Sequence, residues 1–308
     1  MLMSAKKIFK ETKQRVKMEV RKLEEEGITP GFEAILVDDD PTSAMYAEFK
    51  KKDCEEVGIY AEIRRLYEDH PPDEMNERLL LEIDRANRRD DITGVLIQMP
   101  LPPYINRYRA LESLLPEKDV DGLTPYNKGV LMSDYSLGTS LLPCTPAGII
   151  ELLDYYSIDI NGMDATIVGR SELVGKPLRK LLEDRNATVT CCHTSTKEET
   201  KKKFLKESDL VVCAAGRPPE LYEDNWFRLE AKMIKEGAIV ISVGVKKDAK
   251  TGKLYYDLPR GKKFRALEKR ASYITPNLGG VGLMTRGKLL KNIIVAMNLC
   301  KKRIVHVY

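Results

Sequence analysis

The sequence places a tyrosine and a lysine four residues apart in a segment whose pattern predicts a helix. Tyr46 and Lys50 lie in "SAMYAEFKKKDCEEVGI", residues 43–59, after Asp40-Pro41, a pair that can open a helix. Residues four apart share one helix face, so the phenol and the amine project together. An amine held in this way can transfer protons, whereas the simpler interpretation is a solvated face of charged side chains. The residues expected on the buried side of this helix are Met45, Phe49 and Val57.

Polar groups also follow a strand pattern and a turn in the first half of the chain. In "GVLIQMPLP", residues 94–102, Gln98 ends a run of apolar strand residues. The carboxyl ends of parallel strands are where active sites form, although such an amide can also cap loop backbone. The stretch "PEKDVDGL", residues 116–123, carries the carboxylates Asp119 and Asp121. Both aspartates can alternatively be ordinary turn formers.

The second half of the chain contains a candidate phosphate-binding turn. The stretch "VGRSELVGKP", residues 168–177, follows a strand pattern and opens a helix pattern. Gly169 and Gly175 enclose Arg170 and Ser171, which is a weaker signal than a full G-x-G-x-x-G fingerprint. Backbone N–H groups at a helix start can nevertheless hold a phosphate.

The next strand of that half ends in hydroxyl, imidazole and amine groups rather than in a carboxylate. An NAD-specific enzyme usually places an acidic residue there for the ribose hydroxyl. This chain instead reads "CCHTSTK", with His193, Thr194, Ser195 and Lys197 after the strand. These donors suit a 2′-phosphate, so the sequence favours NADP over NAD. The alternative for His193 is a loop histidine that binds no ligand.

Helix and strand patterns alternate along the chain, which predicts an α/β fold with parallel sheets. Helices are expected at residues 4–26, 43–58, 73–88, 146–156 and 285–302, and strands at residues 32–38, 59–66, 92–98, 164–169, 187–192, 208–216 and 237–244. The strand–turn–helix units after residue 160 predict a dinucleotide-binding domain of the Rossmann type. We expect the last helix to return and pack on the first domain.

Composition limits the function classes. The 308 residues are enough for two domains, and the net charge of +4 comes from 51 basic and 47 acidic residues, a balance that does not predict nucleic-acid binding. No apolar run is long enough to predict a membrane span, and three histidines make a zinc site unexpected. The six cysteines lack C-x-x-C spacing, which favours reduced thiols in a cytoplasmic protein.

Taken in order, these motifs resemble the bifunctional methylenetetrahydrofolate dehydrogenase/cyclohydrolase family, FolD. The resemblance covers nearly the whole chain. It is carried by Ser43-x-x-Tyr46-x-x-x-Lys50, "GVLIQMPLP", "PEKDVDG", "PCTPAG", "VGRSELVGKP", "ATVTCCHTST", "GAIVISVG" and "ITPNLGGVGLMT".

The resemblance implies an enzyme with two activities. It would oxidise 5,10-methylenetetrahydrofolate with NADP and hydrolyse the methenyl product to 10-formyltetrahydrofolate. The implied domains are a folate-binding catalytic domain, residues 1–143 plus 285–308, and an NADP-binding domain, residues 144–284. The family also implies a cytoplasmic homodimer that acts on tetrahydrofolate one-carbon derivatives and has neither nucleic-acid nor membrane partners.

The resemblance also assigns roles to individual residues. Lys50 would serve hydrolysis, Gln98 would hydrogen-bond and tune it, Tyr46 would lie against the folate ring system, and Asp121 would bind the polar edge of the pterin. Substrate binding would also involve Ser43, Ile97, Met99, Leu278 and Gly279. The implied NADP-binding residues are Gly169, Arg170, Ser171, His193, Thr194, Ser195, Gly216, Val245 and Thr285, and no metal ligand is implied.

The chain departs from the family pattern near the nicotinamide end. It reads Ser242-Val243-Gly244-Val245-Lys246 where the family usually has Asp-Val-Gly-Ile-Asn, and "LYYDLPRG" where a Gly-Asp-Val normally follows. Asn277, Leu278 and Leu283 replace the usual Val, Pro and Pro in "PNLGGVGLMT". Without the proline, this loop is expected to be more mobile, which would weaken folate binding.

Other functions stay open on the sequence. The chain could keep only one of the two activities, and the intact Lys50 makes the cyclohydrolase the more secure half. A shikimate-type NADP-dependent dehydrogenase shares the two-domain plan, but it would need neither Gln98 nor Asp121. A folate- or nucleotide-binding module without turnover is the non-enzyme alternative.

Overall fold

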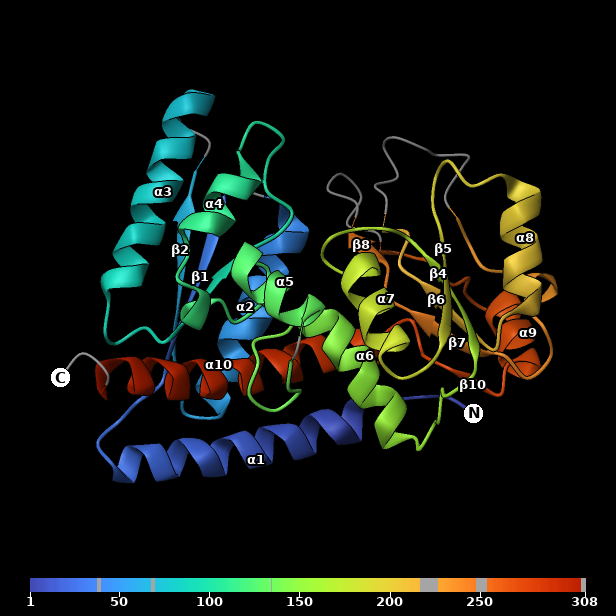
Figure 1. Ribbon diagram of the computed structural model, residues 1–308, viewed down its shortest axis with the longest axis horizontal. Helices are drawn as coiled ribbons and strands as arrows, with labels where there is room; N and C mark the ends of the chain where they lie inside the picture. The colour runs from blue at the N-terminus through green and yellow to red at the C-terminus, as the bar shows by residue number, and fades with distance from the viewer. Residues whose placement is uncertain (38–39, 68–69, 134, 217–226, 248–253, 306–308) are drawn as a thin grey trace. The chain divides into compact units, whose positions relative to one another are not determined.

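The computed structural model describes residues 1–37, 40–67, 70–133, 135–216, 227–247 and 254–305 (Figure 1). The chain divides into two compact units, each built from separate stretches of sequence. The first, here the three-stranded unit, comprises Lys10–Cys144 and Arg286–Tyr308. The second, here the five-stranded unit, comprises Met1–Phe9 and Thr145–Thr285.

The three-stranded unit is built on a parallel sheet in the order β2-β1-β3. Its strands are β1 (Gly31–Val37), β2 (Tyr60–Leu66) and β3 (Gly94–Ile97). The helices α2 (Pro41–Glu56) and α3 (Pro72–Arg88) connect them. Every residue of β1 is buried, as expected for the central strand of a parallel sheet covered on both faces.

Alternate residues of β1 face different helices. Phe32, Ala34 and Leu36 pack in one core with residues of α1 (Lys6–Glu25), α2 and α10 (Val281–Val305). Glu33 points the other way and pairs with Arg85 of α3. The sheet is therefore covered by α2 and the first and last helices on one face, and by α3 on the other.

The five-stranded unit is built on a parallel sheet in the order β10-β7-β6-β4-β5. Its strands are β4 (Asp164–Val168), β5 (Thr188–Cys192), β6 (Leu210–Cys213), β7 (Ile239–Ser242) and β10 (Tyr273–Ile274). Its helices are α6 (Cys144–Tyr155), α7 (Gly175–Glu183), α8 (Glu198–Glu207) and α9 (Lys262–Arg270). The hairpin of β8 (Val245–Lys247) and β9 (Leu254–Tyr256) follows β7. The two-domain α/β fold with parallel sheets is confirmed.

The first nine residues belong to the five-stranded unit, whereas the sequence placed them in the other domain. Met3 N–H donates to Ile274 O at 2.8 Å, and Ala5 N–H donates to Gly279 O at 2.8 Å. These backbone bonds hold the start of the chain beside β10. They join residues some 270 positions apart in the sequence, so local sequence patterns could not predict this contact.

The last helix, α10, begins four residues earlier than expected and continues through both units. Residues up to Thr285 lie in the five-stranded unit, and those from Arg286 lie in the three-stranded unit. Leu289, Leu290 and Ile293 join the core beneath β1, so the expected return of this helix to the first domain is confirmed.

Short elements escaped the sequence analysis. These are α4 (Arg107–Ser113), α5 (Pro125–Met132), the 3₁₀ turns Pro116–Lys118 and Ala231–Met233, α8, α9, the β8–β9 hairpin and β10. They lack a long apolar period because they are short, or because they rest on the core along a narrow face. Leu205 of α8 and Leu267 of α9 are the buried residues of their helices.

Candidate active site

Helix α2 buries the lysine that the sequence singled out. Asp40 caps the helix by accepting the Ser43 N–H at 2.7 Å, and Pro41 occupies its first turn. The buried residues of the helix are Ser43, Ala47, Lys50, Asp53 and Cys54. Lys50 is therefore part of this buried stripe, with 8% of its surface exposed.

This stripe corrects the expected buried face. Phe49 is 41% exposed, and Met45 is only half-buried, while Val57 is buried as expected. The guanidinium of Arg286 lies 5.0 Å from the centre of the Phe49 ring, so a charge covers part of this aromatic. The apolar type of Phe49 was misleading, because the buried stripe is occupied by small and polar residues.

Gln98 holds the Lys50 amine from the end of β3. Lys50 Nζ donates a hydrogen bond to Gln98 Oε1 at 3.0 Å. Gln98 Nε2 donates to Met99 O at 2.7 Å, and the Gln98 backbone N–H donates to Ile35 O at 2.9 Å. These bonds fix the side-chain amide with its oxygen toward the lysine. The predicted Lys50–Gln98 contact is confirmed.

Burial of the amine changes its acidity. Burial lowers the pKa of Lys50 below the usual value of 10.5, and the nearby charge of Asp121 opposes this shift. A neutral amide as the hydrogen-bond partner leaves the amine free to lose its proton. A lysine whose pKa is lowered loses its proton more readily and can therefore act as a proton acceptor.

Asp119 and Asp121, two residues apart, have different surroundings. Asp119 accepts hydrogen bonds from Thr124 N–H at 2.7 Å and Asn127 Nδ2 at 2.9 Å, so it organises the turn into α5. Asp121 is half-buried, and burial raises its pKa while the Lys50 charge opposes the rise. The turn-former interpretation therefore holds for Asp119, and Asp121 is the carboxyl coupled to the lysine.

Gly122 brings the Asp121 segment against the segment before α6. Its φ is +65°, in the region that favours glycine. A Cβ there would lie 2.5 Å from the carbonyl carbon of Leu142 and 2.6 Å from Pro143 N. The two segments can approach so closely only because the side chain is absent.

Two residues that the sequence did not single out hold the Asp121 segment against the segment before α6. Asn292 of α10 donates through Nδ2 to Val120 O at 2.8 Å and to Leu142 O at 3.0 Å. The Cys144 thiol donates to Val120 O at 3.2 Å. A polar residue amid the apolar period of α10 was the available signal for Asn292.

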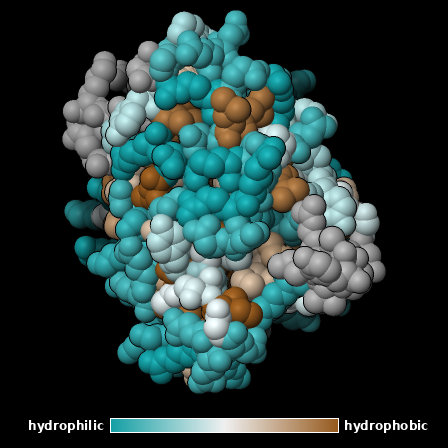
Figure 2. All heavy atoms as spheres, turned by 90° about the vertical axis from the view of Figure 1, so that its left-hand side faces the viewer, coloured by the Kyte–Doolittle hydropathy of each residue, from teal (hydrophilic) through white to brown (hydrophobic). Residues whose placement is uncertain are grey.

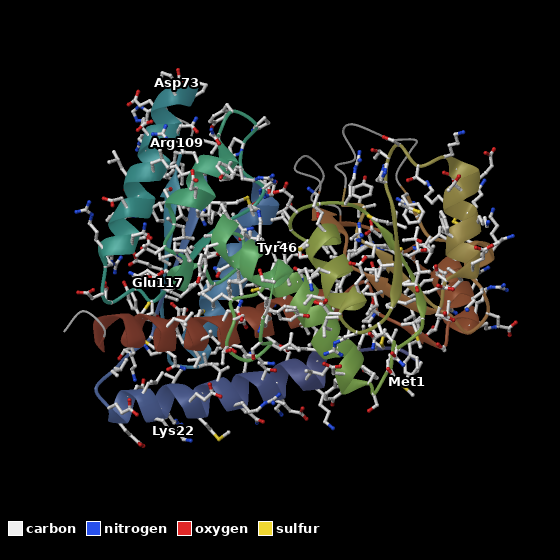
Figure 3. All side chains as sticks on the ribbon, viewed as in Figure 1. Met1, Lys22, Tyr46, Asp73, Arg109 and Glu117 are labelled. Atoms are coloured by element: carbon white, nitrogen blue, oxygen red, sulfur yellow. The ribbon has the colours of Figure 1, made fainter. Side chains whose placement is uncertain are left out.

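The remaining predicted folate residues fall into two groups. Tyr46 projects from α2, one turn before Lys50, and is half-buried (Figure 3). Ser43 and Ile97 are buried, and Met99 is half-buried beside Gln98. These residues belong to the three-stranded unit, as do Lys50, Gln98 and Asp121. Leu278 and Gly279 belong to the five-stranded unit.

Hydrogen bonds hold the residues on either side of Leu278. Leu278 is 64% exposed, but its neighbour Asn277 donates through Nδ2 to Pro259 O at 3.1 Å, and Gly279 O accepts the Ala5 N–H. From Val281 the chain is helical, so "VGLMT" forms the start of α10 rather than a loop. Backbone and side-chain hydrogen bonds thus hold the segment from which the proline is missing.

In the five-stranded unit, Gly169 ends β4 in a turn with no space for side chains. A Cβ on Gly169 would lie 2.2 Å from Ala214 O, and a Cβ on Gly175 would lie 2.3 Å from Gly169 O. Ser171 Oγ accepts the Val174 N–H at 3.1 Å, while Arg170 is exposed. The two glycines therefore let the end of β4 pack closely on the start of α7, which is the arrangement of a strand–turn–helix phosphate site.

The segment after β5 is also ordered and accessible. His193 Nδ1 accepts the Ser195 N–H at 3.2 Å, and the His193 N–H donates to Thr196 Oγ1 at 2.9 Å. Thr194 and Ser195 are exposed and His193 is half-buried. Since β4 and β5 are parallel neighbours, this segment and the Gly169 turn lie at the same edge of the sheet.

The other predicted cofactor residues follow β6, β7 and β10. Gly216 is exposed after β6, and half-buried Val245 begins β8 just after β7. Thr285, in the first turns of α10, shares a hydrogen bond of 3.0 Å with Thr145 Oγ1. Of the departures nearby, Ser242 is buried at the end of β7, and the side chain of Lys246 lies outside the described residues.

Asp257 is a completely buried carboxyl within the departure "LYYDLPRG", where the sequence did not mark it as a site residue. Its Oδ2 accepts hydrogen bonds from the backbone amides of Gly244 at 3.0 Å and Ala215 at 3.3 Å. The signal for it was an acidic residue directly after the apolar "LYY", where a solvent-exposed turn residue is the usual expectation.

The surface drawn in Figure 2 is mostly hydrophilic, with hydrophobic residues in small separate patches. Across the part of the chain that the structure describes, no helix combines the length and the apolar character that crossing a membrane requires.

Comparison with known proteins identifies both halves of the chain. Residues 3–121 match the catalytic domain of tetrahydrofolate dehydrogenase/cyclohydrolase, and residues 143–301 match its NAD(P)-binding domain. The bifunctional protein FolD of Pyrobaculum calidifontis is 48% identical over 298 residues, covering 96% of this chain and 94% of that protein.

Solved structures agree with these matches. The bifunctional FolD enzyme of Campylobacter jejuni is 37% identical with a TM-score of 0.83, covering 97% of this chain and 99% of that chain. The Trypanosoma brucei FolD, solved with NADP cofactor and an inhibitor, is 31% identical with a TM-score of 0.86, covering 97% and 98%. The chain belongs to the tetrahydrofolate dehydrogenase/cyclohydrolase family.

Proposed function

We propose that the two activities of this family use different residues of the chain, with hydrolysis centred on Lys50. The protein oxidises 5,10-methylenetetrahydrofolate with NADP and hydrolyses the methenyl product to 10-formyltetrahydrofolate. The observation that carries the assignment is a buried lysine amine of lowered pKa, held at 3.0 Å by the neutral amide of Gln98. This chemistry matches the needs of a hydrolysis and decides against a shikimate-type dehydrogenase.

The hydrolytic step requires proton transfer at two points. Water adds to the methenyl carbon of the cationic substrate and loses a proton, which the neutral Lys50 amine accepts. The adduct then opens as the bond from this carbon to N5 breaks: its hydroxyl releases its proton to solvent while the formyl C=O forms, and the lysine returns its proton to N5. Gln98 keeps the amine oriented without adding a charge that would raise its pKa.

The other folate residues orient the substrate. Asp121 accepts hydrogen bonds from the polar edge of the pterin, and its coupling to Lys50 links binding to the charge of the amine. Tyr46, on the same helix face as Lys50, provides an aromatic surface for the folate ring system. Ser43, Ile97 and Met99, with Leu278 and Gly279, complete the proposed substrate contacts.

The turn after β4 fits NADP, because its two glycines let the strand end pack closely on the start of α7, with the exposed Arg170 and Ser171 between them. When bound, NADP supplies the nicotinamide ring that accepts the hydride. Gly169 and Ser171 would hold the pyrophosphate, while Arg170, His193, Thr194 and Ser195 would contact the 2′-phosphate. Gly216, Val245 and Thr285 would border the nicotinamide end.

Kinetic assays of the purified protein test both activities. Methylenetetrahydrofolate and NADP should give reduced-nicotinamide absorbance, and added methenyltetrahydrofolate should disappear faster than its uncatalysed hydrolysis. Loss of only the first signal would mean that the departures near the nicotinamide end have removed the dehydrogenase. Loss of both would refute the assignment for this chain.

We also infer a cytoplasmic homodimer. Strand β2 is an edge of the three-stranded sheet and exposes 47% of Tyr60, which offers a surface for a second copy. The six cysteines are free thiols, which suits a reducing compartment. Light scattering coupled to size-exclusion chromatography tests the dimer, and a monomer at micromolar concentration would refute it.

A further inference from the structure

Asp257 links two turns at the edge of the sheet where the proposed cofactor residues lie. Ala215 follows β6, Gly244 follows β7, and these two strands are parallel neighbours. The Asp257 carboxylate accepts the backbone N–H of both residues through Oδ2, at 3.3 Å and 3.0 Å. Gly216 and Val245, both assigned to the cofactor, are the next residues along each turn.

The fit between Asp257 and Gly244 is close. A Cβ on Gly244 would lie 2.1 Å from Asp257 Oδ2, so the carboxylate occupies the space that a side chain would need. The Asp257 N–H donates back to Gly244 O at 3.3 Å, and Val245 pairs with Tyr256 across the β8–β9 hairpin. Asp257 therefore determines where the backbone between β7 and β8 runs.

We propose that Asp257 is a positioning residue for the NADP site, whose ionised carboxylate fixes the Ala215–Gly216 and Gly244–Val245 turns against which the cofactor binds. This inference depends on the proposed use of NADP. An ionised acceptor forms stronger hydrogen bonds to N–H groups than a neutral one does. The order of both turns therefore depends on the charge of this buried group.

Burial raises the pKa of Asp257 to about 6, and the backbone amides of Gly244, Ala215 and Gly216 oppose the rise. One titratable neighbour is the thiol of Cys213 at the end of β6, whose pKa is raised well above its usual value by burial and, to a lesser extent, by the Asp257 carboxylate. That thiol stays neutral near pH 6. As the pH falls through about 6, Asp257 gains a proton and the turns lose their anionic acceptor.

The test is a fluorescence titration of NADPH with the purified protein, as a function of pH. Asp257→Asn keeps the shape of the side chain but removes its charge. We expect this variant to bind NADPH about three- to tenfold more weakly at neutral pH, the usual effect of weakening a charge-assisted hydrogen bond. The native protein should lose affinity for NADPH below pH 6 as Asp257 gains a proton. The variant should not show this part of the loss. The 2′-phosphate of the ligand is the same in both titrations, so the difference between the two curves isolates Asp257.

Asp209 provides a matched control at the opposite end of β6. It also accepts a backbone amide, that of Asp164 at 3.0 Å, and it pairs with Lys235. Asp209→Asn should leave the affinity for NADPH and its pH dependence unchanged. Equal affinity losses in both variants would mean that Asp257 acts through general stability, and the proposal would then be wrong.

Amide hydrogen exchange gives a readout that needs neither catalysis nor cofactor. In the native protein, protection of the Ala215 and Gly244 amides should fall below pH 6 relative to that of Val212 in β6. Unchanged relative protection would overturn the proposal, even if Asp257→Asn does not fold. A native protein that binds no NADPH at any pH would instead refute the proposed cofactor, a different outcome.

Discussion

At the scale of single residues, the site depends on which polar groups are buried and what accompanies them. Lys50 and Lys118 are both buried lysines whose pKa burial lowers, yet their partners differ. Lys118 donates to three backbone carbonyls at the end of α3, those of Ala86, Asn87 and Arg89. Lys118 therefore has a structural role. The Lys50 amine instead donates to one neutral side-chain amide and lies near the carboxyl of Asp121.

Lys50→Met should abolish the hydrolysis of methenyltetrahydrofolate above its uncatalysed rate while leaving hydride transfer measurable, because only hydrolysis needs the amine. Following both reactions in one preparation tests this. Lys118→Met is the matched control: it should lower thermal stability but retain hydrolysis per folded molecule. Catalysed hydrolysis that persists without the Lys50 amine would exclude it as the proton carrier.

The pH dependence of hydrolysis should report the Lys50 amine. Because the neutral amine accepts the proton, kcat/KM should rise as the pH rises through a pKa below the usual lysine value. Gln98→Glu places a carboxylate next to the amine, favours its charged form and should shift the rise to higher pH. A profile identical in Gln98→Glu and the native enzyme would show that another group titrates.

At the scale of elements, α10 organises the crossing of the Asp121 segment over the residues before α6. Asn292 supplies both hydrogen bonds from one buried side-chain amide, and Gly122 supplies the space. These interactions position Asp121 without contacting it directly.

Asn292→Leu should destabilise the protein by about 2 kcal/mol, because buried carbonyls lose their donor. It should also raise KM for the folate substrate more than KM for NADP, since Asp121 loses its support. Chemical denaturation and steady-state kinetics measure the two effects. Asn298→Leu, the same change at an exposed position of α10, should do neither. Equal KM changes for both substrates would contradict a local role.

The elements that the sequence predicted are those with long apolar periods or buried runs. β1, β4, β6 and β7 could be located because parallel strands covered on both faces form buried apolar runs. The Lys50–Gln98 pair could be predicted because motif order carried it. The buried face of α2 could not be predicted, because small and polar residues form it. The role of Asp257 could not be predicted either, because its partners are backbone amides distant in the sequence.

At the scale of the whole molecule, the side chains proposed for proton transfer and those proposed for NADP lie in separate units. The residues proposed for hydrolysis belong to the three-stranded unit, and those proposed for NADP belong to the five-stranded unit. Changes in one set should therefore leave the binding function of the other nearly intact, as expected for sites without shared partners.

Arg170→Ala should weaken NADP binding on the order of tenfold while changing NAD binding little, because only NADP offers a 2′-phosphate to the exposed guanidinium. Methenyl hydrolysis should keep its native rate. Arg179→Ala removes a comparable exposed arginine of α7, one that pairs with Glu183, and serves as the control. Equal losses for NADP and NAD would refute the contact with the 2′-phosphate.

The course of α10 also has a consequence for how the protein is made. Leu289, Leu290 and Ile293 complete the core under β1, yet the ribosome adds them after every strand of both sheets. During synthesis this face of the three-stranded sheet, which α1 and α2 cover only in part, therefore remains incomplete until the whole five-stranded unit has emerged. Nascent chains at this stage present the surface that chaperones recognise and that promotes aggregation. The late addition of one helix thus makes folding of the earlier-synthesised unit a post-translational event.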